Sequence, residues 1–195
     1  MLSLRPSTTG VYGLGPWFRK VPALQENVSL PQYFHAAGYQ TYTCGKVYHN
    51  SWGSRPTAGG VPEFTHWGPG GGPGIMPPEK LIPETPHGNN PWVDWGVFPH
   101  EDAQKGDWKV ADWAVSRLAE MPDDKPFFMA VGFFAPHVPC YVTQSWWDKY
   151  PDETLAMPPL QPDDRVDCSP FSWYLHWKLP EPRLSWLIKN NQHRN

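Results

Sequence analysis

The hydrophobic pattern along the chain predicts a strand, a helix and a second strand. Residues 39–44 (YQTYTC) alternate between two faces, which is typical of a strand. Residues 125–134 (KPFFMAVGFF) carry an unbroken apolar run, which indicates a strand covered on both faces, as in a parallel sheet. A helical pattern over 106–122 separates them. This order forms a βαβ unit, so we expect an α/β fold in which helices flank a mostly parallel sheet.

The helix over 106–122 has recognisable ends. Asp107 is a candidate cap, and Pro122 ends the pattern. The side expected to be buried follows helical spacing and comprises Ala111, Ala114, Val115 and Leu118.

A shorter helix is predicted just before the first strand, in the stretch NVSLPQYFHAAGY. Ser29 is a candidate N-cap, and Pro31 lies in the first turn, where its missing N–H costs nothing. Gly38 fits the left-handed position that follows a helix C-terminus. A third helix is expected near the end of the sequence, from about Pro182.

Regular structure is hard to predict from about residue 50 to residue 106. Stretches such as WGPGGGPGIMPPEK are dense in proline and glycine, which break helices and strands. The segment is too long for a simple connection, so we expect an irregular loop insertion over 50–106 with a functional role. We also expect tryptophans to anchor it, namely Trp52, Trp67, Trp92 and Trp95.

The amino-acid composition limits the kinds of molecule that this protein is expected to bind. The sequence has 195 residues, a formal net charge of -3, 25 prolines, 17 glycines and 12 tryptophans. Proline and glycine together stay below the roughly 25–30% of low-complexity chains, and the aromatic rings can bury large apolar areas. No basic stripe indicates nucleic acid and no polybasic segment indicates a membrane surface. No apolar run approaches the about 18 residues of a membrane span, and residues 1–10 do not resemble a signal peptide.

Polar side chains follow both predicted strands. Lys46 and His49, in the stretch CGKVYHN, come after the first strand, and His137, in FFAPHVPC, comes after the second. Sites in α/β sheets gather beyond the carboxyl ends of strands, so these three residues could converge on one anion such as sulfate or phosphate. Each of them taken alone is as easily a solvated loop residue.

Four stretches in order resemble the sulfatase family, most closely its iduronate-2-sulfatase-like branch. They are GLGPWFR, SLPQYFHAAGYQTYTCGKVYH, KPFFMAVGFFAPHVP and FSWYLHWKLPEPRLSW. The resemblance runs nearly end to end and implies an alkaline-phosphatase-like α/β fold. It also implies a sulfuric ester hydrolase that uses a calcium ion and a formylglycine nucleophile.

The resemblance assigns a catalytic role to each of the three candidates. Lys46 would neutralise charge on the sulfate. His49 would hydrogen-bond the formylglycine hydrate and act as a general base when sulfate is shed. His137 would hold the sulfate and protonate the leaving alcohol. Preorganised cationic donors suit a negatively charged sulfuryl group, and histidine can supply a proton near neutral pH.

The departures from the family pattern are as informative. No Cys or Ser stands in C/S-x-P-S-R, the motif that yields formylglycine, so we expect it upstream of Met1. No aspartate matches a metal-ligand position of the family, so the calcium ligands are also expected outside the chain. Residues 1–195 would then be the central part of a sulfatase N-terminal catalytic domain, truncated at both ends and inactive alone. Many relatives carry a lysine where Ala135 stands, which bears on substrate preference.

The expected partners follow from this resemblance. They are a sulfated carbohydrate or another sulfate ester, and a formylglycine-generating enzyme for the full-length protein. Localisation is open, although full-length relatives are expected to be periplasmic, extracellular or lysosomal. Two alternatives remain. A phosphatase or phosphonate-ester hydrolase of the same superfamily would use the same donors, and a truncated, non-catalytic carbohydrate-binding remnant would stack sugars on its tryptophans.

Overall fold

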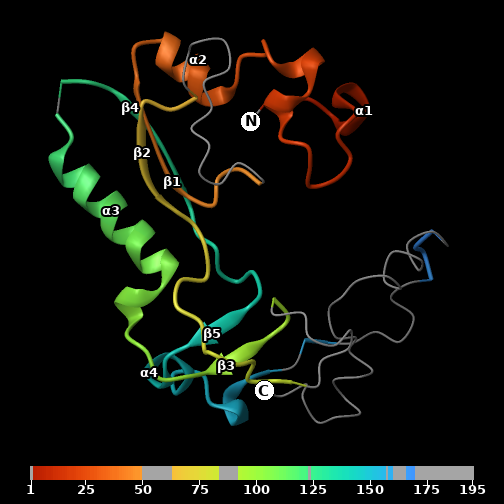
Figure 1. The fold of residues 1–195 in the computed structure, drawn as a ribbon, viewed down its shortest axis with the longest axis vertical. Coiled ribbons are helices and arrows are strands. Elements are labelled where there is room, and N and C mark those ends of the chain that lie inside the picture. Colours follow the sequence, from red (N-terminus) through yellow and green to blue (C-terminus); the bar gives the residue numbers. More distant parts are fainter. Residues whose placement is uncertain are drawn as a thin grey trace. The chain divides into compact units, whose positions relative to one another are not determined.

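The computed structural model describes residues 2–49, 63–83, 92–122, 124–156, 158–159 and 166–169 (Figure 1). The chain divides into two compact units. The first comprises residues 1–75 and 103–135, and the second comprises residues 76–102 and 136–195. The helix expected from Pro182 lies outside the described residues.

A parallel sheet forms the centre of the first unit. Its strands are β1 (Gln40–Gly45), β2 (His66–Gly70) and β4 (Phe127–Gly132), in the order β2-β1-β4. Both pairings are parallel, and β1 pairs with β4 in unbroken register over its whole length. The expected α/β fold with a mostly parallel sheet is therefore confirmed.

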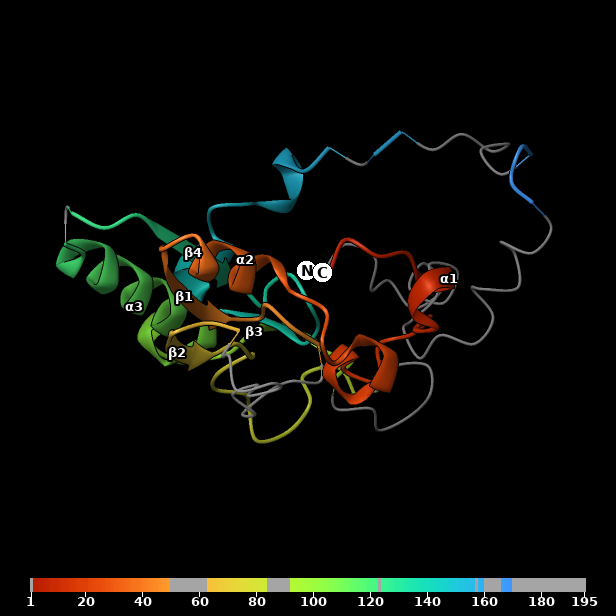
Figure 2. The same cartoon turned by 90° about the horizontal axis from the view of Figure 1, so that it is seen from above.

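Two helices cover opposite faces of this sheet (Figure 2). Helix α3 (Gly106–Glu120) buries Val110 and Ala114 against Cys44 of β1. Helix α2 (Leu30–Ala36) lies on the other face, where Phe34 stacks on Phe128 of β4 with ring centroids 4.6 Å apart. Because successive residues of a strand point to opposite faces, this arrangement explains why residues 41–44 of the central strand are all buried.

Helix α2 begins as its sequence predicts. Ser29 is the N-cap, and its backbone N–H donates to the side-chain oxygen of Gln32 at 3.0 Å. Pro31 lies in the first turn. Gly38 has a φ of +88°, the left-handed conformation that glycine adopts without steric cost.

Helix α3 corrects two expectations. Its buried side is formed by Val110 and Ala114, whereas Val115 and Leu118 are exposed. The expected apolar stripe is therefore confirmed at Ala114 and wrong at Val115 and Leu118, because contact with β1 and β2 selects the buried face. Asp107 is not the cap either. Lys105 occupies that position, and Asp107 bonds to the loop that follows β4.

The second strand of the βαβ unit is less covered than its apolar run suggests. Phe127 and Val131 of β4 are exposed, and so is Phe133 just beyond the strand. Strand β4 pairs only with β1 among the described residues. The expectation of cover on both faces is therefore wrong for β4, whereas β1, for which it was not made, is covered on both faces.

Two short strands lie within residues 50–106, where an irregular segment was expected. One is β2, and the other is β3 (Trp95–Val97) of the second unit. Gly68 explains how β2 forms from the unpromising sequence HWGPG: a Cβ at this position would lie 2.5 Å from the ring of Trp113 on α3. The missing side chain lets the indole pack directly on the strand.

The second unit is organised around the buried carboxylate of Asp94. Strand β3 pairs in parallel with β5 (Cys140–Val142). Asp94 accepts hydrogen bonds from the backbone N–H groups of Leu81 and Ile82 and from the hydroxyl of Tyr141. One side chain therefore ties together three segments that are distant in the sequence.

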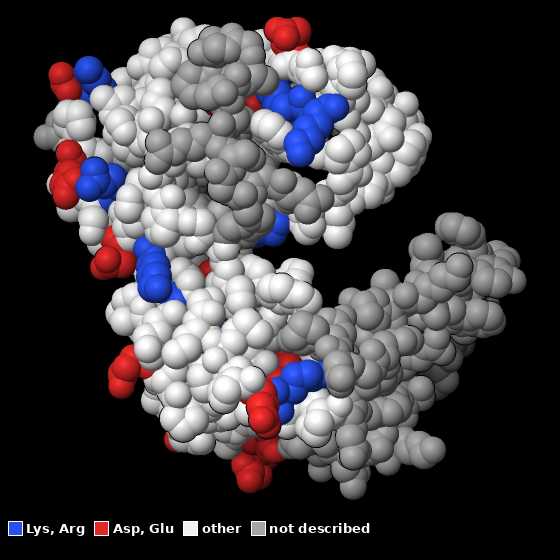
Figure 3. Space-filling view, viewed as in Figure 1, with Lys and Arg blue, Asp and Glu red and all other residues white. Residues whose placement is uncertain are grey.

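The remaining elements are single turns. In the first unit they are α1 (Pro6–Thr9), η1 (Phe18–Lys20) and η2 (Pro22–Leu24). Further along the chain they are η4 (Asp102–Gln104), α4 (Gln144–Trp147) and η5 (Asp152–Thr154). No helix among the described residues has the length and apolarity needed to cross a bilayer. On the face seen in Figure 3, basic and acidic residues of the described part are interspersed.

Candidate functional site

Two glycines fix the point at which the chain leaves the sheet beside the candidate site. Gly45 ends β1 with a φ of +72°, and a Cβ there would lie 1.9 Å from the carbonyl oxygen of Gly132. A Cβ on Gly132 would lie 2.1 Å from the carbonyl oxygen of Lys46. The close approach lets the backbone N–H of Lys46 donate to Gly132 at 2.6 Å. Lys46 is therefore held at the carboxyl end of the central strand.

The side chains of Lys46 and His49 meet in the loop that follows β1. The Nζ atom of Lys46 lies 2.8 Å from Nδ1 of His49 and donates to the backbone carbonyl of Tyr48 at 3.2 Å. Partial burial lowers the pKa of Lys46, because it penalises the charged ammonium. His49 is exposed. The structure thus brings together two of the three residues expected to bind an anion.

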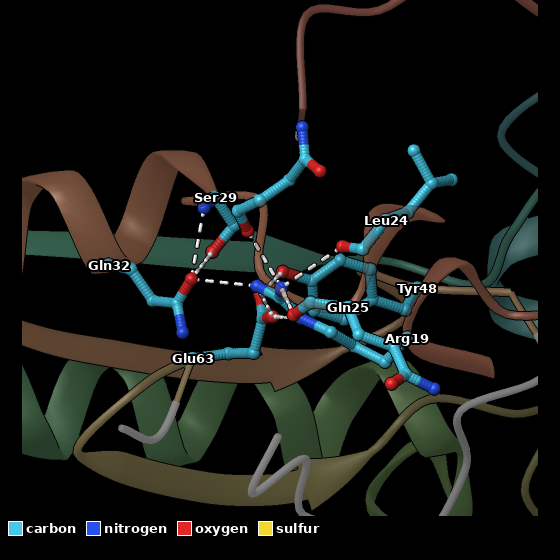
Figure 4. Close-up of polar contacts among 8 residues, drawn as sticks. Arg19, Leu24, Gln25, Ser29, Gln32, Tyr48 and Glu63 are labelled. Carbon is cyan, nitrogen blue, oxygen red and sulfur yellow. Dashed lines mark hydrogen bonds and ion pairs between the residues drawn. The ribbon is translucent and has the colours of Figure 1, made fainter. Parts of the chain in front are cut away.

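A buried ion pair lies behind this loop (Figure 4). The side chains of Arg19 and Glu63 are 2% and 1% exposed, and Nη2 of Arg19 lies 2.5 Å from Oε1 of Glu63. Nε of Arg19 donates to the same oxygen at 2.6 Å. The guanidinium also donates to the backbone carbonyls of Gln25 and Asn27 and to the side chain of Gln32. Such a pair tolerates burial because its donors are satisfied.

Tyr48 connects the ion pair to the Lys46–His49 loop. Its hydroxyl donates to Oε2 of Glu63 at 2.6 Å. Its ring lies near Phe18 and Phe64, with centroids 6.0 and 6.4 Å away. Burial, followed by the hydrogen bond and the charge of Glu63, raises the pKa of Tyr48, so the phenol stays protonated and remains a donor.

His137 is exposed and belongs to the second unit. Its Nδ1 lies 2.6 Å from the backbone carbonyl of Val138. The loop before it is held where the first unit ends, because Asp107 accepts hydrogen bonds from the backbone N–H groups of Phe134 and Ala135 at 2.7 and 2.9 Å. The expected convergence of His137 with Lys46 and His49 stays a prediction.

Sequence reasoning missed the residues that support the site. Arg19 lies in the quoted stretch GLGPWFR, where an arginine beside two aromatic residues is a weak signal of burial. Glu63 and Asp94 each stand next to buried apolar residues, Phe64 and Val93 respectively. A charged residue inside such a run needs a partner. The identity of that partner could not be read from the sequence, since Glu63 and Arg19 are 44 positions apart.

The acidic residues that the structure describes are not arranged as a calcium site. Within the described ranges, no group of three or more His, Cys, Asp and Glu side chains could hold a metal ion. Asp102 instead accepts hydrogen bonds from the hydroxyl of Thr143 and the indole of Trp146. Calcium is coordinated by about six to eight oxygen atoms, and these residues do not provide such a set of ligands.

The tryptophans considered for sugar stacking differ in their surroundings. Trp67 packs on Phe64 with ring centroids 5.7 Å apart and donates to its carbonyl, so it contributes to the core. Trp92 and Trp146 are exposed, and the ammonium of Lys149 lies 3.8 Å from the ring centroid of Trp146. Trp52 lies outside the described residues.

Lys46 and His49 are in contact beyond the central strand of a parallel sheet, the place where α/β proteins commonly bind their ligands. The family model described as Sulfatase matches residues 1–159. The chain is 32% identical over 206 residues to a protein named "Sulfatase" from Formosa agariphila, covering 98% of this chain and 39% of that protein. It is 29% identical over 171 residues to iduronate 2-sulfatase of Homo sapiens, covering 82% of this chain and 30% of that protein.

The chain therefore belongs to the sulfatase family, whose members are sulfuric ester hydrolases. Iduronate 2-sulfatase of Mus musculus is similar as well, at 29% identity over 176 residues. The chain spans about two fifths of the length of the bacterial relative and less than a third of the mammalian ones. These matches confirm the family that the four sequence stretches indicated.

Proposed function

We propose that this chain forms part of the active site of an iduronate-2-sulfatase-like enzyme that hydrolyses sulfate esters, most naturally those of sulfated sugars. The contact between Lys46 and His49, 2.8 Å apart at the carboxyl end of β1, carries the proposal. It supplies a positive charge and an imidazole in one place, which is what a sulfuryl group carrying negative charge requires. Membership of the sulfatase family supports hydrolysis of a sulfate ester as the reaction at this site.

Each of the three residues has a distinct part. The ammonium of Lys46 offsets the charge that collects on the sulfate oxygens. His49 donates a hydrogen bond to the group that attacks sulfur or to the sulfate itself. His137 gives a proton to the bridging ester oxygen as its bond to sulfur breaks, so that the product leaves as a neutral alcohol. Formylglycine and calcium are expected from the family, but the described residues hold neither a nucleophile motif nor a metal cluster, so no step here is assigned to them.

The proposal is tested in a version of the protein extended in frame on both sides of residues 1–195 and coexpressed with a formylglycine-generating enzyme. Release of 4-nitrophenol from its sulfate ester is followed for Lys46→Gln, His49→Gln and His137→Gln. Each histidine change is expected to lower kcat by about 10²–10⁴-fold, the usual contribution of acid–base and hydrogen-bonding groups. His35→Gln is the matched control, because His35 is an exposed histidine on α2 with no part in the proposed site.

Two outcomes would overturn the proposal. One is unchanged sulfate hydrolysis in the His49 and His137 variants. The other is a preference of the extended protein for 4-nitrophenyl phosphate over the sulfate, which would indicate a phosphatase of the same superfamily. The 195-residue chain alone is expected to show no turnover in the same assay.

A further inference from the structure

We propose that Asp107 is a positioning residue for His137: it holds the loop after β4 so that the imidazole meets the ester oxygen that leaves sulfur. The inference rests on the proposed function, in which His137 protonates that oxygen. Asp107 has no contact with the reacting atoms in this scheme. It acts through two backbone N–H groups of the loop that carries the general acid.

The carboxylate of Asp107 is divided between two successive residues of that loop. Oδ1 accepts a hydrogen bond from the N–H of Phe134 at 2.7 Å, and Oδ2 accepts one from the N–H of Ala135 at 2.9 Å. One oxygen for each donor fixes both the position and the direction of the backbone, because a single bond would leave it able to pivot. Bonds to a charged acceptor are also stronger than bonds between neutral groups.

Only a short stretch of chain separates this anchor from the imidazole. His137 comes two residues after Ala135, and an extended chain spans at most about 3.3–3.6 Å per residue, so their Cα atoms lie within roughly 7 Å. Pro136 stands between them, and its ring fixes its φ. The first compact unit ends at Ala135. Asp107 therefore secures the point at which the chain enters the segment that carries His137.

The start of α3, from which Asp107 projects, is itself closely packed. A Cβ on Gly106 would lie 2.0 Å from the carbonyl oxygen of Gly72, so the helix begins against the segment that follows β2. Val110, in the next turn, is fully buried in one cluster with Cys44 of the central strand. The carboxylate of Asp107 is therefore presented by a backbone that is held on two sides.

The loop after β4 is also fixed where it begins, and there the partner is a residue of the proposed site. The backbone N–H of Lys46 donates to the carbonyl oxygen of Gly132, the last residue of β4, at 2.6 Å. Asp107 then holds Phe134 and Ala135. The path of the chain from Gly132 to Ala135 is thus defined at both ends, and the lysine of the site defines one of them.

The proposed chemistry makes this placement important. As the bond between sulfur and the ester oxygen breaks, the electron pair stays on oxygen, and a proton from His137 converts that oxygen into the hydroxyl of the alcohol. A general acid works only within hydrogen-bond reach of the atom it protonates. A displacement of about 1 Å can cost on the order of 10²-fold in rate. The proton matters more for a more basic leaving group, so a misplaced acid slows phenyl sulfate more than 4-nitrophenyl sulfate.

The test compares these two substrates in the extended protein, coexpressed with a formylglycine-generating enzyme. Values of kcat and KM are measured for the wild type, Asp107→Asn and Asp107→Ala. With phenyl sulfate, kcat is expected to fall by up to about 10²-fold in Asp107→Ala, and by less in Asp107→Asn, whose side chain keeps one acceptor oxygen. With 4-nitrophenyl sulfate the losses should be smaller. Asp112→Ala, on the exposed side of α3, is the control and should leave both substrates unaffected.

A double variant separates positioning from a general loss of stability. Asp107→Ala added to His137→Gln should lower the turnover of phenyl sulfate little further, because the acid that Asp107 positions is already gone. A loss of folded protein would instead lower the turnover of both substrates by the same factor in either background. Asp107→Asn is close to the native side chain in shape and serves as the test where the alanine variant fails to fold.

The His137 variant distinguishes failure of this inference from failure of the proposed function. Unchanged kcat in both Asp107 variants, or equal losses for the two substrates, would overturn the positioning role, while a slow His137→Gln would still support the proposed function. Wild-type activity of His137→Gln with both substrates would refute the proposed role of His137, and the positioning role of Asp107 would fall with it.

Discussion

Asp107, in the first turn of α3, accepts a hydrogen bond from the backbone N–H of Phe134 at 2.7 Å and so ties the start of the helix to the loop after β4. Its second oxygen accepts from Ala135 at 2.9 Å. The loop is thereby held two residues before His137. A carboxylate that accepts backbone N–H bonds is a strong anchor, because bonds to a charged group are worth about 1.5–3 kcal/mol each.

Removing this anchor should loosen the loop while leaving the sheet intact. In Asp107→Ala we expect faster amide hydrogen exchange at Phe134 and Ala135, because both N–H groups lose their acceptor. Asp112→Ala, on the exposed side of the same helix, is the control and should leave both rates unchanged. Equal exchange rates in Asp107→Ala and the wild type would show that other contacts hold the loop.

The close backbone approach of Gly45 and Gly132 should not tolerate a side chain at either residue. Gly45→Ala places a Cβ within 1.9 Å of a backbone oxygen in a residue whose φ is +72°. The left-handed conformation alone costs an alanine about 1–2 kcal/mol, and the clash adds to it. We expect a lower free energy of unfolding in urea. Gly13→Ala has open space around its Cβ and should change little. Equal changes in the free energy of unfolding for the two substitutions would contradict this close backbone approach.

The buried ion pair of Arg19 and Glu63 should contribute far more to the free energy of unfolding than an exposed ion pair does. Arg19→Met leaves Glu63 charged and buried, so the free energy of unfolding should fall by about 3–5 kcal/mol. Adding Glu63→Gln should recover part of this loss, because it removes the unpaired charge. Arg117→Met is the matched control. Its pair with Glu120 is 42% and 60% exposed, and such pairs contribute about 0–1 kcal/mol. Similar losses for the two arginine variants would count against this reasoning.

Local signals in the sequence predicted the parts of the fold that local physics decides. Ser29 and Gly38 bound α2 as expected, because capping and left-handed termination depend only on nearby backbone. The buried side of α3 was predicted correctly at Ala114 and wrongly at Val115, because the choice between Val110 and Val115 depends on which face meets β1. Strand β2 was missed, since the partner that makes its glycine favourable, Trp113, is distant in the sequence.

In the candidate site, too, the local contact could be predicted from the sequence and the long-range contacts could not. The contact of Lys46 with His49 follows from three-residue spacing in one loop, and both residues were expected. The support behind them was not, because Arg19 and Glu63 become partners only when the chain folds. A buried charge can be suspected from its apolar neighbours, but its acceptor or donor cannot be identified without the tertiary structure.

Cys44 should be the least reactive of the three thiols in the folded protein. It is 3% exposed, and its Sγ donates to the carbonyl of Val110. Burial raises the pKa of this thiol from 9.0 to about 11, because the thiolate would lose its hydration. At pH 8 the reactive thiolate fraction is then about 100-fold lower than that of a solvated cysteine, before any shielding is counted.

The measurement is alkylation by iodoacetamide at pH 8, followed by mass spectrometry of each cysteine peptide. Exposed Cys168 should react much faster than buried Cys44, because reagent reaches its sulfur directly. The rates should become equal in denaturant. The raised pKa also sets a direction for stability. The contribution of the neutral thiol is fully present below pH 9.0 and is lost as pH rises through about 11, because the unfolded chain ionises first. Cys44→Ala should flatten this decline in the free energy of unfolding. An unchanged decline, or equal alkylation of Cys44 and Cys168 in the folded chain, would contradict the burial of this thiol beneath α3.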